Sequence, residues 1–556
     1  MYISKVVIEN FKCFQGRFSL ELNQELNILV GDNSVWKTTI LEAIHLAFSW
    51  WIYGKYLWVE LKQSLFNNAI IENYLNCLKT EERIPPPKII IELYFSGIEN
   101  DSIKALFEWN YNTSRTKACG ISFEIGFFDS ELNRQQYGLW LEKNKDSKSL
   151  PIEFYEYWWT TFARDSAIKP RIFNQYFNST FIDSSNYRYQ NGCDVEVLKS
   201  VKSYLSDQEK IAVSLAHRNM QDKFSADEAI IPINAKLGIA NFSQKKLSLA
   251  VEWASKTARE DSLTVYVGET PFSNSGRWEQ CIIKTKLALN TKKTDKSNVL
   301  LFEEPENHLS HSNLSKLINY ISENYNDKQI IISTHSSFVA NKLLLWNLII
   351  LNKTLDNKIL QTKMASLSPS TQQYFSKISG YDTLRLILCE KAILVEWPSD
   401  ELIVQRAYKD KRRRLPIEDG IDVISVGTSF LRFLELAEKV EKKIAVITDN
   451  DWDYEHKIVN KYHSYNDKEW VKICADKNNV LYTLEPQLIE VNKSNLALLR
   501  SILGVDSEQY SNEESLSEYM QEHKTDYALK IFDYIGMIQY PKYILDAINR
   551  VHDTKK

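Results

Sequence analysis

The chain has 556 residues, of which 44% are hydrophobic and 25% charged, and its 68 basic and 72 acidic residues give a formal net charge of −4. This length exceeds what a single hydrophobic core supports, so we expect two to four ordinary globular domains. The near balance of charge does not exclude nucleic acid, because a local basic face is enough for binding. The seven cysteines are scattered without a C-x-x-C pair, which indicates reduced thiols and not a disulfide framework.

The sequence contains no candidate membrane segment. Its N-terminus enters an amphipathic strand, "YISKVVIENF", with no signal-peptide pattern. No apolar run approaches the roughly 18 residues that a membrane-spanning helix needs. We therefore expect a cytoplasmic protein that does not contact a membrane. Glycine is scarce, with 16 residues, whereas tryptophan reaches 14, and this imbalance recurs in the motifs below.

The predicted elements alternate between strands and helices. The first 48 residues read as two strands and an amphipathic helix, and "KIIIELYF" predicts a strand near 88–95. Residues from about 195 to 265 are mostly of helical pattern and look like an insertion. The strand–helix alternation returns at "SNVLLFEEPE" and "KQIIISTHS". After a polar, serine-rich stretch near 366–380, a second α/β unit begins at "KAILVE" and continues through "IDVISV" and "KIAVITD".

The first motif is "GDNSVWKTT", which follows an apolar strand and opens a helix. It has the spacing of the phosphate-binding loop G-x-x-x-x-G-K-[ST], except that Trp36 stands where the template has its second glycine. In such a loop the backbone N–H groups surround phosphates, Lys37 pairs with the β- and γ-phosphates, and Thr38 holds Mg²⁺. The predicted nucleotide contacts are Gly31, Asn33, Ser34, Lys37, Thr38, Thr39 and, further along, His335.

Two later strand ends supply the rest of a nucleotide-hydrolysing site. The strand "NVLLF" ends in Glu303 and Glu304, which suit metal coordination and polarisation of an attacking water, respectively. About thirty residues on, "KQIIISTHS" ends a strand at His335, where an imidazole can sense a γ-phosphate. Residues 1–48 and 270–345 thus resemble the ATPase head of the RecF, SMC and ABC class, in which two heads sandwich ATP. The motifs "EEPENHL" and "ISTHSS" resemble the overcoming lysogenization defect (OLD) family in particular.

The second motif is a set of carboxylates at two strand ends. "ILVEWPSDE" ends a strand at Glu396 and begins a helix that carries Asp400 and Glu401. "KIAVITDNDWD" ends another strand, and its carboxylates are Asp449, Asp451 and Asp453. Parallel strands bring such residues to the carboxyl edge of one sheet. Carboxylate oxygens at this density suit Mg²⁺ or Mn²⁺, and two such ions can activate water and stabilise the leaving oxygen of a phosphodiester.

This pair of segments resembles the TOPRIM fold of topoisomerases, primases and OLD nucleases. Glu396 matches the glutamate of the family's Glu-Gly motif, and Asp449 and Asp451 match its Asp-x-Asp motif. Between the motifs, "VISVGTSFLRF" also resembles the OLD family. The late segment "HKTDYALKIFD" resembles the place where these nucleases keep a phosphate-binding lysine, for which Lys524 is the first choice and Lys530 the second. The resemblance assigns metal binding to Thr38, Glu303, Glu396, Asp400, Asp449 and Asp451.

The combined resemblance predicts an α/β protein in which a split ABC/SMC-like P-loop ATPase head with a helical dimerisation insertion precedes a C-terminal TOPRIM domain of Rossmann-like fold. The predicted segments are the head (1–190 and 269–365), the insertion (191–268), a linker (366–384) and the TOPRIM domain (385–556). The resemblance implies ATP and Mg²⁺ or Mn²⁺ as cofactors and a bacterial DNA endonuclease of the antiphage kind, similar to the nuclease subunits of Gabija-type or retron-associated systems.

The implied partners are DNA, a second copy bound through the head and insertion, and a defence partner. That partner is a helicase-like subunit or a reverse transcriptase with its DNA. The basic run "KDKRRRLP" at 409–416 can touch a DNA backbone or be a solvated loop.

Tryptophan occupies four motif positions where related sequences have glycine or another small residue: Trp36, Trp278, Trp397 and Trp452. Glycine tolerates φ > 0 and lets the backbone approach phosphate or metal closely. Two alternatives to an active endonuclease therefore stay open. One is a catalytically impaired scaffold of the same fold that binds DNA or a partner, and the other is a RecF-like DNA-repair ATPase. The carboxylates at 396, 449 and 451 count against the second alternative.

Overall fold

The computed structural model of the chain divides into two compact units, Met1–Asn27 with Trp36–Thr334 and Ile28–Val35 with His335–Lys556. The division after Thr334 differs from the boundary near residue 365 predicted from the sequence. The residues described are 1–31, 36–49, 51–52, 55–79, 84–143, 147–163, 177–183, 201, 205–225, 227–239, 265–289, 298–307, 309–324, 327–335, 347–353, 359–363, 367–377, 381–506 and 508–552. The predicted contacts Asn33 and Ser34 lie outside them.

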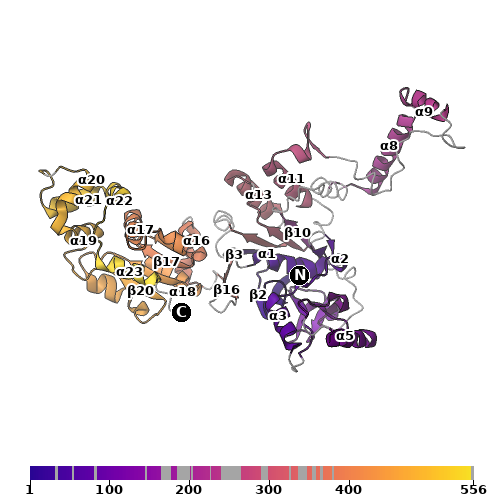
Figure 1. Cartoon of the computed structure of the whole chain (residues 1–556), viewed down its shortest axis with the longest axis horizontal. Coiled ribbons are helices and arrows are strands. Elements are labelled where there is room, and N and C mark those ends of the chain that lie inside the picture. Colours follow the sequence, from indigo (N-terminus) through magenta and orange to yellow (C-terminus); the bar gives the residue numbers. More distant parts are fainter. Residues whose placement is uncertain are drawn as a thin grey trace. The chain divides into compact units, whose positions relative to one another are not determined.

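An antiparallel sheet forms one layer of the first unit (Figure 1). Its strand order is β2-β1-β6-β8-β7, and β9 also pairs with β8. The strands are β1 (Tyr2–Glu9), β2 (Arg17–Glu21), β6 (Ile89–Ser96), β7 (Glu108–Trp109), β8 (Ala118–Phe127) and β9 (Tyr155–Thr161). Strand β6 confirms the prediction near 88–95, and its first seven residues are all buried. Such a strand is covered on both faces, which explains why its buried residues are apolar except for Glu92.

Three parallel strands form a second layer of this unit, in which β13 (Val299–Glu303) pairs with β10 (Ser179–Asp183) and with β14 (Gln329–Thr334). Helix α1 (Lys37–Ser49) packs against β10 and β13 and also against β6, so it lies between the two layers (Figure 1). The predicted apolar positions of this helix are all buried: Ile40, Ala43, Ile44, Ala47 and Phe48. Burial of this face fixes the helix start, where the motif lysine and threonines lie.

The shorter elements of the first unit surround these layers. They are β4 (Trp51–Ile52), β5 (Lys55–Tyr56), α2 (Leu57–Glu60), α3 (Asn68–Cys77), α4 (Asp101–Phe107), α5 (Glu131–Lys143), β11 (Tyr266–Val267), β12 (Thr270–Pro271), α11 (Arg277–Leu289) and α13 (His311–Asn324). The described part of the predicted insertion contains α8 (Asp207–Ser225) and α9 (Ile230–Ile239), as its helical pattern indicated. None of the described helices is both long and apolar enough to cross a membrane.

The second unit contains a four-stranded parallel sheet with the order β18-β17-β19-β20. Its strands are β17 (Lys391–Val395), β18 (Ile421–Ser425), β19 (Lys443–Ile447) and β20 (Val471–Cys474). The same unit contains β3 (Leu26–Gly31), which pairs in parallel with β15 (Leu348–Lys353), and β16 (Ile359–Lys363), which pairs antiparallel with β15. The described part of the predicted linker is helical, with α15 (Pro369–Lys377) and the start of α16 (Tyr381–Leu388).

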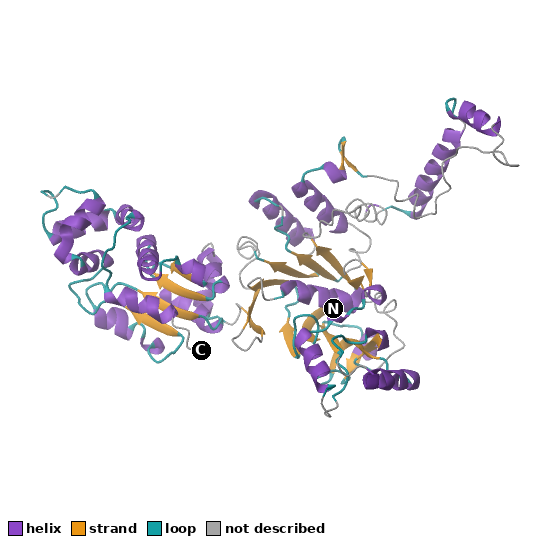
Figure 2. Ribbon diagram, viewed as in Figure 1, coloured by secondary structure: helices purple, strands orange, loops and turns teal. Residues whose placement is uncertain are grey.

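Helices cover the parallel sheet, as Figure 2 shows for the second unit. They are α17 (Pro398–Arg412), α18 (Phe430–Lys439), α19 (Leu484–Val491), α20 (Leu496–Leu503), α21 (Glu513–Glu522), α22 (Lys524–Asp533) and α23 (Lys542–His552). Alternate strand residues such as Ile393 and Val395 share one core with α17 and α23. The intervening Ala392 and Leu394 are also fully buried, so this strand has an apolar residue at nearly every position.

One buried arginine joins α17 to the end of α22. The Arg406 side chain is 5% exposed. Its guanidinium donates to the carbonyl oxygens of Phe532 and Gly536 at 2.8 Å each, and also to that of Tyr534. The Phe532 carbonyl lies in the last turn of α22 and the other two follow that turn, where carbonyls have no partner further along the helix, so the arginine satisfies them. The contact fixes α22 against α17, and both helices begin at the carboxyl edge of the sheet.

Candidate nucleotide site and carboxylate cluster

The start of helix α1 and the end of β13 meet in the first unit. The Thr38 hydroxyl donates to Glu303 Oε1 at 2.5 Å, although the two residues are 265 positions apart. Lys37 and Glu303 are both buried, with exposed fractions of 4% and 7%. A loop threonine and a strand-end acid are the pair that holds Mg²⁺ in P-loop ATPases. The sequence-predicted pairing of these two residues at one place is therefore present in the fold, and this donor set fits Mg²⁺.

The second acid of the motif is oriented by its neighbours. The Glu304 carboxylate accepts a hydrogen bond from the Asn307 amide at 2.7 Å, and the Glu304 N–H donates to the Ser333 carbonyl at 2.9 Å. The Glu304 backbone has φ of 42°, a left-handed conformation at the strand end. Thr39 is buried beside Cys13, whose thiol donates to its hydroxyl at 3.5 Å. His335, the predicted γ-phosphate sensor, directly follows β14.

Backbone geometry explains why the loop has glycine at position 31 and shows that Trp36 adopts an unfavourable conformation. A Cβ atom at Gly31 would lie 2.4 Å from the Leu351 carbonyl oxygen, so the close approach of β15 requires glycine there. Trp36 has φ of 51°, in the left-handed region. A bulky L-residue pays about 1–2 kcal/mol for this conformation. The Trp36 indole packs edge-on against Phe14, with ring centroids 5.7 Å apart.

In the second unit, five helix and strand ends form a cluster of carboxylates around one lysine. Glu396 follows β17, and Asp400 lies in the first turn of α17. Asp449 follows β19, and Lys524 is the first residue of α22. The fifth member, Glu485, begins α19 and was not predicted from the sequence; its Oε1 lies 3.8 Å from Lys524 Nζ. Because β17 and β19 are parallel neighbours, their carboxyl ends bring these residues to one edge of the sheet.

Burial and mutual repulsion raise the pKa values of carboxyl groups in the cluster. Removal from water raises the pKa of Asp400 to about 7, and the charges of Glu485 and Glu396 add to this. Burial raises the pKa of Asp449 well above its usual range, and the negative charges of Asp400 and Glu396 raise it further. Burial and the charge of Asp451 raise the pKa of Glu396. In each of these three cases the ammonium of Lys524 acts in the opposite direction.

The loop after β19 is held in place by one buried amide. Asn450 is fully buried, and its side-chain NH₂ donates to the carbonyl oxygens of Asp476, Asn478 and Leu481 at 3.0, 2.9 and 3.3 Å. Its Oδ1 accepts from the Trp452 N–H at 3.0 Å. These bonds keep Asp451 and Trp452 at φ of 46° and 64°. The Asp451 carboxylate, which is more exposed, pairs with Lys457 at 3.2 Å.

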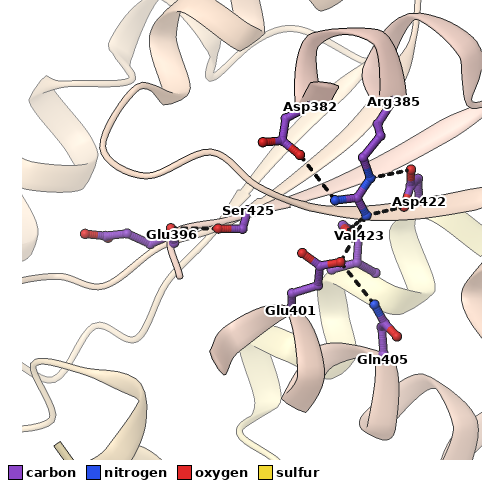
Figure 3. A network of polar contacts seen from close by, with 8 residues as sticks. All are labelled: Asp382, Arg385, Glu396, Glu401, Gln405, Asp422, Val423 and Ser425. Atoms are coloured by element: carbon purple, nitrogen blue, oxygen red, sulfur yellow. Dashed lines mark hydrogen bonds and ion pairs between the residues drawn. The ribbon is translucent and has the colours of Figure 1, made fainter. Parts of the chain in front are cut away.

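Three predicted residues have other partners. The Glu401 carboxylate accepts from Arg385 at 3.0 Å, within a network in which Arg385 also makes two bonds to Asp422 (Figure 3). Figure 3 shows the Glu396 side chain extending away from this network. Asp453 lies 2.9 Å from the imidazole of His456, and Lys530 donates to the Leu503 carbonyl at 2.5 Å. Among the interactions described, none of the three joins the carboxylate cluster.

The cluster suits a divalent cation in its chemistry. Glu485 is 1% exposed, and its Oε2 has no hydrogen-bond partner among the described residues. A buried carboxylate oxygen without a partner is costly unless a cation or water satisfies it. The described residues contain no ready-made group of three His, Cys, Asp or Glu ligands. Oxygen donors from Glu396, Asp400, Asp449 and Glu485 nevertheless match the preference of Mg²⁺ or Mn²⁺. The sequence signal for Glu485 was weak: one acid at the start of the apolar helix "LEPQLIEV".

The four motif tryptophans differ in backbone conformation. Trp36 and Trp452 have φ > 0. Trp397 has φ of −117°, and Trp278 lies in helix α11. A glycine is therefore favoured by the backbone at only two of the four positions. Trp278, Trp397 and Trp452 are 49%, 44% and 61% exposed.

The left-handed Trp36 generates a prediction about nucleotide binding. We expect Trp36→Gly to bind ATP roughly tenfold more tightly, equivalent to ~1.4 kcal/mol, because glycine relieves the backbone cost and lets the loop approach phosphates. Titration with a fluorescent ATP analogue measures the change. Trp109→Gly, which removes a 54% exposed indole from the antiparallel sheet, is the matched control. Equal affinity of the parent chain and Trp36→Gly would show that the indole does not limit binding.

The raised pKa of Asp400 predicts how stability depends on pH. A carboxyl whose pKa rises from 3.8 to about 7 on folding contributes stability below pH 4 and loses it as the pH rises to 7. In EDTA, Asp400→Asn should therefore gain stability relative to the parent between these values, by at most ~1.4 kcal/mol per pH unit. Urea unfolding at a series of pH values measures this difference. Parallel pH profiles for the two proteins would contradict the prediction.

Comparison with known proteins finds two matching family models and one relative. The model of the AAA ATPase domain matches residues 1–270 and 280–340, and that of the overcoming lysogenization defect protein-like TOPRIM domain matches 387–451. Endonuclease GajA of Bacillus cereus (strain VD045) is 21% identical over 471 residues, which are 81% of this chain and 75% of that protein.

Two solved structures show weak overall likeness. The SMC head domain from Thermotoga maritima has 13% identity and a TM-score of 0.30 and covers 66% of this chain and 100% of that one. The C-terminal region of the Xanthomonas campestris pv. campestris OLD protein has 19% identity and a TM-score of 0.24 and covers 30% of this chain and 94% of that one. The family match over more than half of the chain identifies the N-terminal part. The chain belongs to the AAA ATPase domain family and carries an OLD-like TOPRIM domain behind the ATPase domain.

Proposed function

We propose that this protein is an ATP-binding, divalent-metal-dependent DNA endonuclease that hydrolyses phosphodiester bonds at the carboxylate cluster. The observation that carries the proposal is the convergence of Asp400, Asp449 and Glu485 around Lys524 at the carboxyl edge of the parallel sheet. Structural stability does not call for such a group, since its members repel one another. The TOPRIM match, the ATPase match and the similarity to a protein named an endonuclease support the same function.

The surroundings of each residue in the cluster suit it to a different role in cleavage. Glu396, Asp400, Asp449 and Glu485 would hold the cation, and Asp451 would complete the set from the loop that follows β19. A bound divalent cation supplies a water of lowered pKa and neutralises charge on the phosphate. Lys524 provides a positive charge at the cluster that binds a non-bridging phosphate oxygen. Glu396 has a raised pKa and partial exposure, which suit acceptance of a proton from the attacking water.

The ATPase domain would regulate this site. Lys37 and Thr38 would bind the phosphates and Mg²⁺, Glu303 would help to hold the Mg²⁺, and Glu304 would orient the hydrolytic water. The Thr38–Glu303 hydrogen bond supports this assignment, because it brings together the hydroxyl and the carboxylate that would hold the ion. His335 remains the proposed sensor of the γ-phosphate. Nucleotide state in the head then controls access of DNA to the TOPRIM domain.

A second candidate function is favoured by the left-handed Trp36 and Trp452. If these indoles prevent nucleotide binding or turnover, the chain is an impaired scaffold that still binds DNA or a defence partner. The resemblance to Gabija-type and retron-associated nucleases supports antiphage defence for either function. Its partner would be a helicase-like subunit or a reverse transcriptase with its DNA.

Self-association through the insertion forms part of the proposal. Helix α8 exposes apolar side chains at Ile211, Leu215 and Met220, with exposed fractions of 61%, 53% and 60%. Unpaired apolar surface of this kind on one helix favours pairing with a second copy. Light scattering after gel filtration should show a homodimer or larger oligomer, and the double substitution Ile211→Glu/Leu215→Glu should lower the mass to that of a monomer. The exposed Lys210→Glu is the control on the same helix. An unchanged oligomer in the double variant would remove the insertion from the interface.

Plasmid cleavage tests the catalytic proposal. We expect nicking in Mg²⁺ or Mn²⁺, and the nucleotide dependence follows from reactions with and without ATP. Asp449→Ala/Asp451→Ala should abolish nicking, and Glu485→Gln should lower its rate by about two orders of magnitude, the usual effect of losing a metal-supporting group. Glu401→Gln, which alters the Arg385 network and not the cluster, is the matched control.

The outcomes separate the alternatives. Nicking that survives Asp449→Ala/Asp451→Ala would rule out the carboxylate cluster as the catalytic site. A parent chain that is inactive, with activity restored by Trp36→Gly and Trp397→Gly, would favour the impaired scaffold. ATP hydrolysis without nicking by any variant would favour the repair-ATPase alternative.

A further inference from the structure

We propose that Trp452 and Trp397 form a stacking surface for unpaired nucleobases, so that the DNA presented to the carboxylate cluster is single-stranded or locally melted. The inference rests on the proposed cleavage function and names its substrate class. Each indole follows a carboxylate of the site directly in the chain, Trp452 after Asp451 and Trp397 after Glu396. Both are large exposed aromatic residues, with exposed fractions of 61% and 44%.

The orientation of Trp452 is fixed before any ligand binds. Its backbone N–H donates to the side chain of the fully buried Asn450. One face of its indole stacks on Tyr482, with ring centroids 3.9 Å apart and an interplanar angle of 21°. Tyr482 is held in turn, since its hydroxyl accepts from Gln521 at 3.0 Å and its carbonyl accepts from the Asp451 N–H at 3.2 Å. A rigid, pre-stacked pair loses little conformational entropy when a base joins the stack.

Trp397 lies beside the lysine of the cluster. Its N–H donates to the Asp400 carboxylate at 2.9 Å, which fixes the backbone at the start of α17. The Lys524 ammonium lies 5.3 Å from the centroid of its ring. A cation at this distance from an indole polarises the ring and holds it in place. The second indole is therefore tied to the same group that would bind the phosphate.

Charge at the site fits a nucleic-acid backbone. Lys457 and Lys461 approach the carboxylates of the two strand ends, Lys457 at 3.2 Å from Asp451 and Lys461 within the electrostatic reach of Glu396. Lys524 thus lies beside the Trp397 ring, and Lys457 pairs with Asp451, the residue directly before Trp452. Aromatic rings interleaved with basic side chains are the arrangement by which proteins bind single strands, because bases stack on the rings while phosphates pair with the cations.

The rings favour an unpaired strand over a duplex or a peptide. The π-faces of duplex bases are covered by their neighbours, so an indole can stack only on a base that is unpaired, terminal or extruded. A fold-stabilising role does not account for Trp452, because its side chain is mostly in water and its backbone has an unfavourable φ of 64°. A peptide could pack against the indoles but has no phosphates for the lysines to bind. Absence of oligo(dT) binding in the test below would point to such a partner.

Fluorescence anisotropy with the full chain tests the proposal. Two probes are used: a short fluorescein-labelled oligo(dT) and a blunt duplex of equal length that carries the same label. Both are measured in buffer that contains Ca²⁺ in place of Mg²⁺. We expect oligo(dT) to bind more tightly than the duplex and to quench tryptophan fluorescence. Trp452→Ala should weaken oligo(dT) binding roughly 5- to 150-fold, the affinity range of one stacked base, and leave duplex binding within about twofold. Trp397→Ala should act in the same direction.

Further variants separate stacking from folding and backbone effects. Trp452→Phe keeps an aromatic face and should retain most of the affinity, whereas Trp452→Gly removes the ring but relieves the left-handed backbone and should behave as Trp452→Ala. Trp109→Ala, far along the chain in the antiparallel sheet, should change nothing. Equal loss of oligo(dT) and duplex binding in Trp452→Ala, full affinity in Trp452→Gly, or no oligo(dT) binding by the parent chain would each overturn the proposal.

The binding assay also separates this inference from the proposed cleavage. Absence of plasmid nicking with preserved, Trp452-dependent oligo(dT) binding would reject the endonuclease and keep the stacking surface. Nicking at an unchanged rate on gapped and fully paired plasmid, in parent and Trp452→Ala alike, would keep the endonuclease and reject the stacking surface.

Discussion

The repulsion among buried carboxylates at one edge of a parallel sheet is the constraint on which the second unit depends. Asp400 and Glu485 are almost completely buried, yet they lie close enough to Asp449 to raise its pKa. Like charges in a medium of low dielectric constant repel strongly, and the single ammonium of Lys524 offsets only part of this. The fold tolerates the arrangement because rigid elements fix every member. In the function proposed above, a divalent cation bound by these carboxylates would relieve the repulsion.

The elements around the cluster serve this purpose. The strands β17 and β19 bring two acids to the same edge, and α17 adds a third. Helices α19 and α22 bring a fourth acid and the lysine from distant parts of the sequence. Arg406 satisfies the carbonyls at the end of α22 and so fixes the helix that begins with Lys524. Asn450 does the equivalent for the loop after β19 by occupying three carbonyl groups. These two buried side chains determine how firmly the charged groups are held.

In the first unit the chain brings together two residues that the sequence separates by 265 positions, Thr38 and Glu303. Helix α1, which follows the loop, is fixed by burial between an antiparallel and a parallel layer of strands. Against this ordered background, Trp36 is a local conflict, since a left-handed backbone favours glycine. Trp452 shows the same conflict beside the second site. In both cases the strain lies next to residues proposed to bind charged ligands, and unusual backbone conformations are commonly found at such sites.

The sequence by itself determined the ATPase and TOPRIM motifs, the strand–helix order around them, and most of the acids that gather at the two sites. It could do so because these features are local: apolar runs predict strands, and strand ends at the carboxyl edge of a parallel sheet predict where side chains converge. Only the tertiary structure decided that Glu485 joins the cluster while Glu401 pairs with Arg385. Both are glutamates in the first turns of helices, and only the elements packed against each helix determine which cation its carboxylate meets.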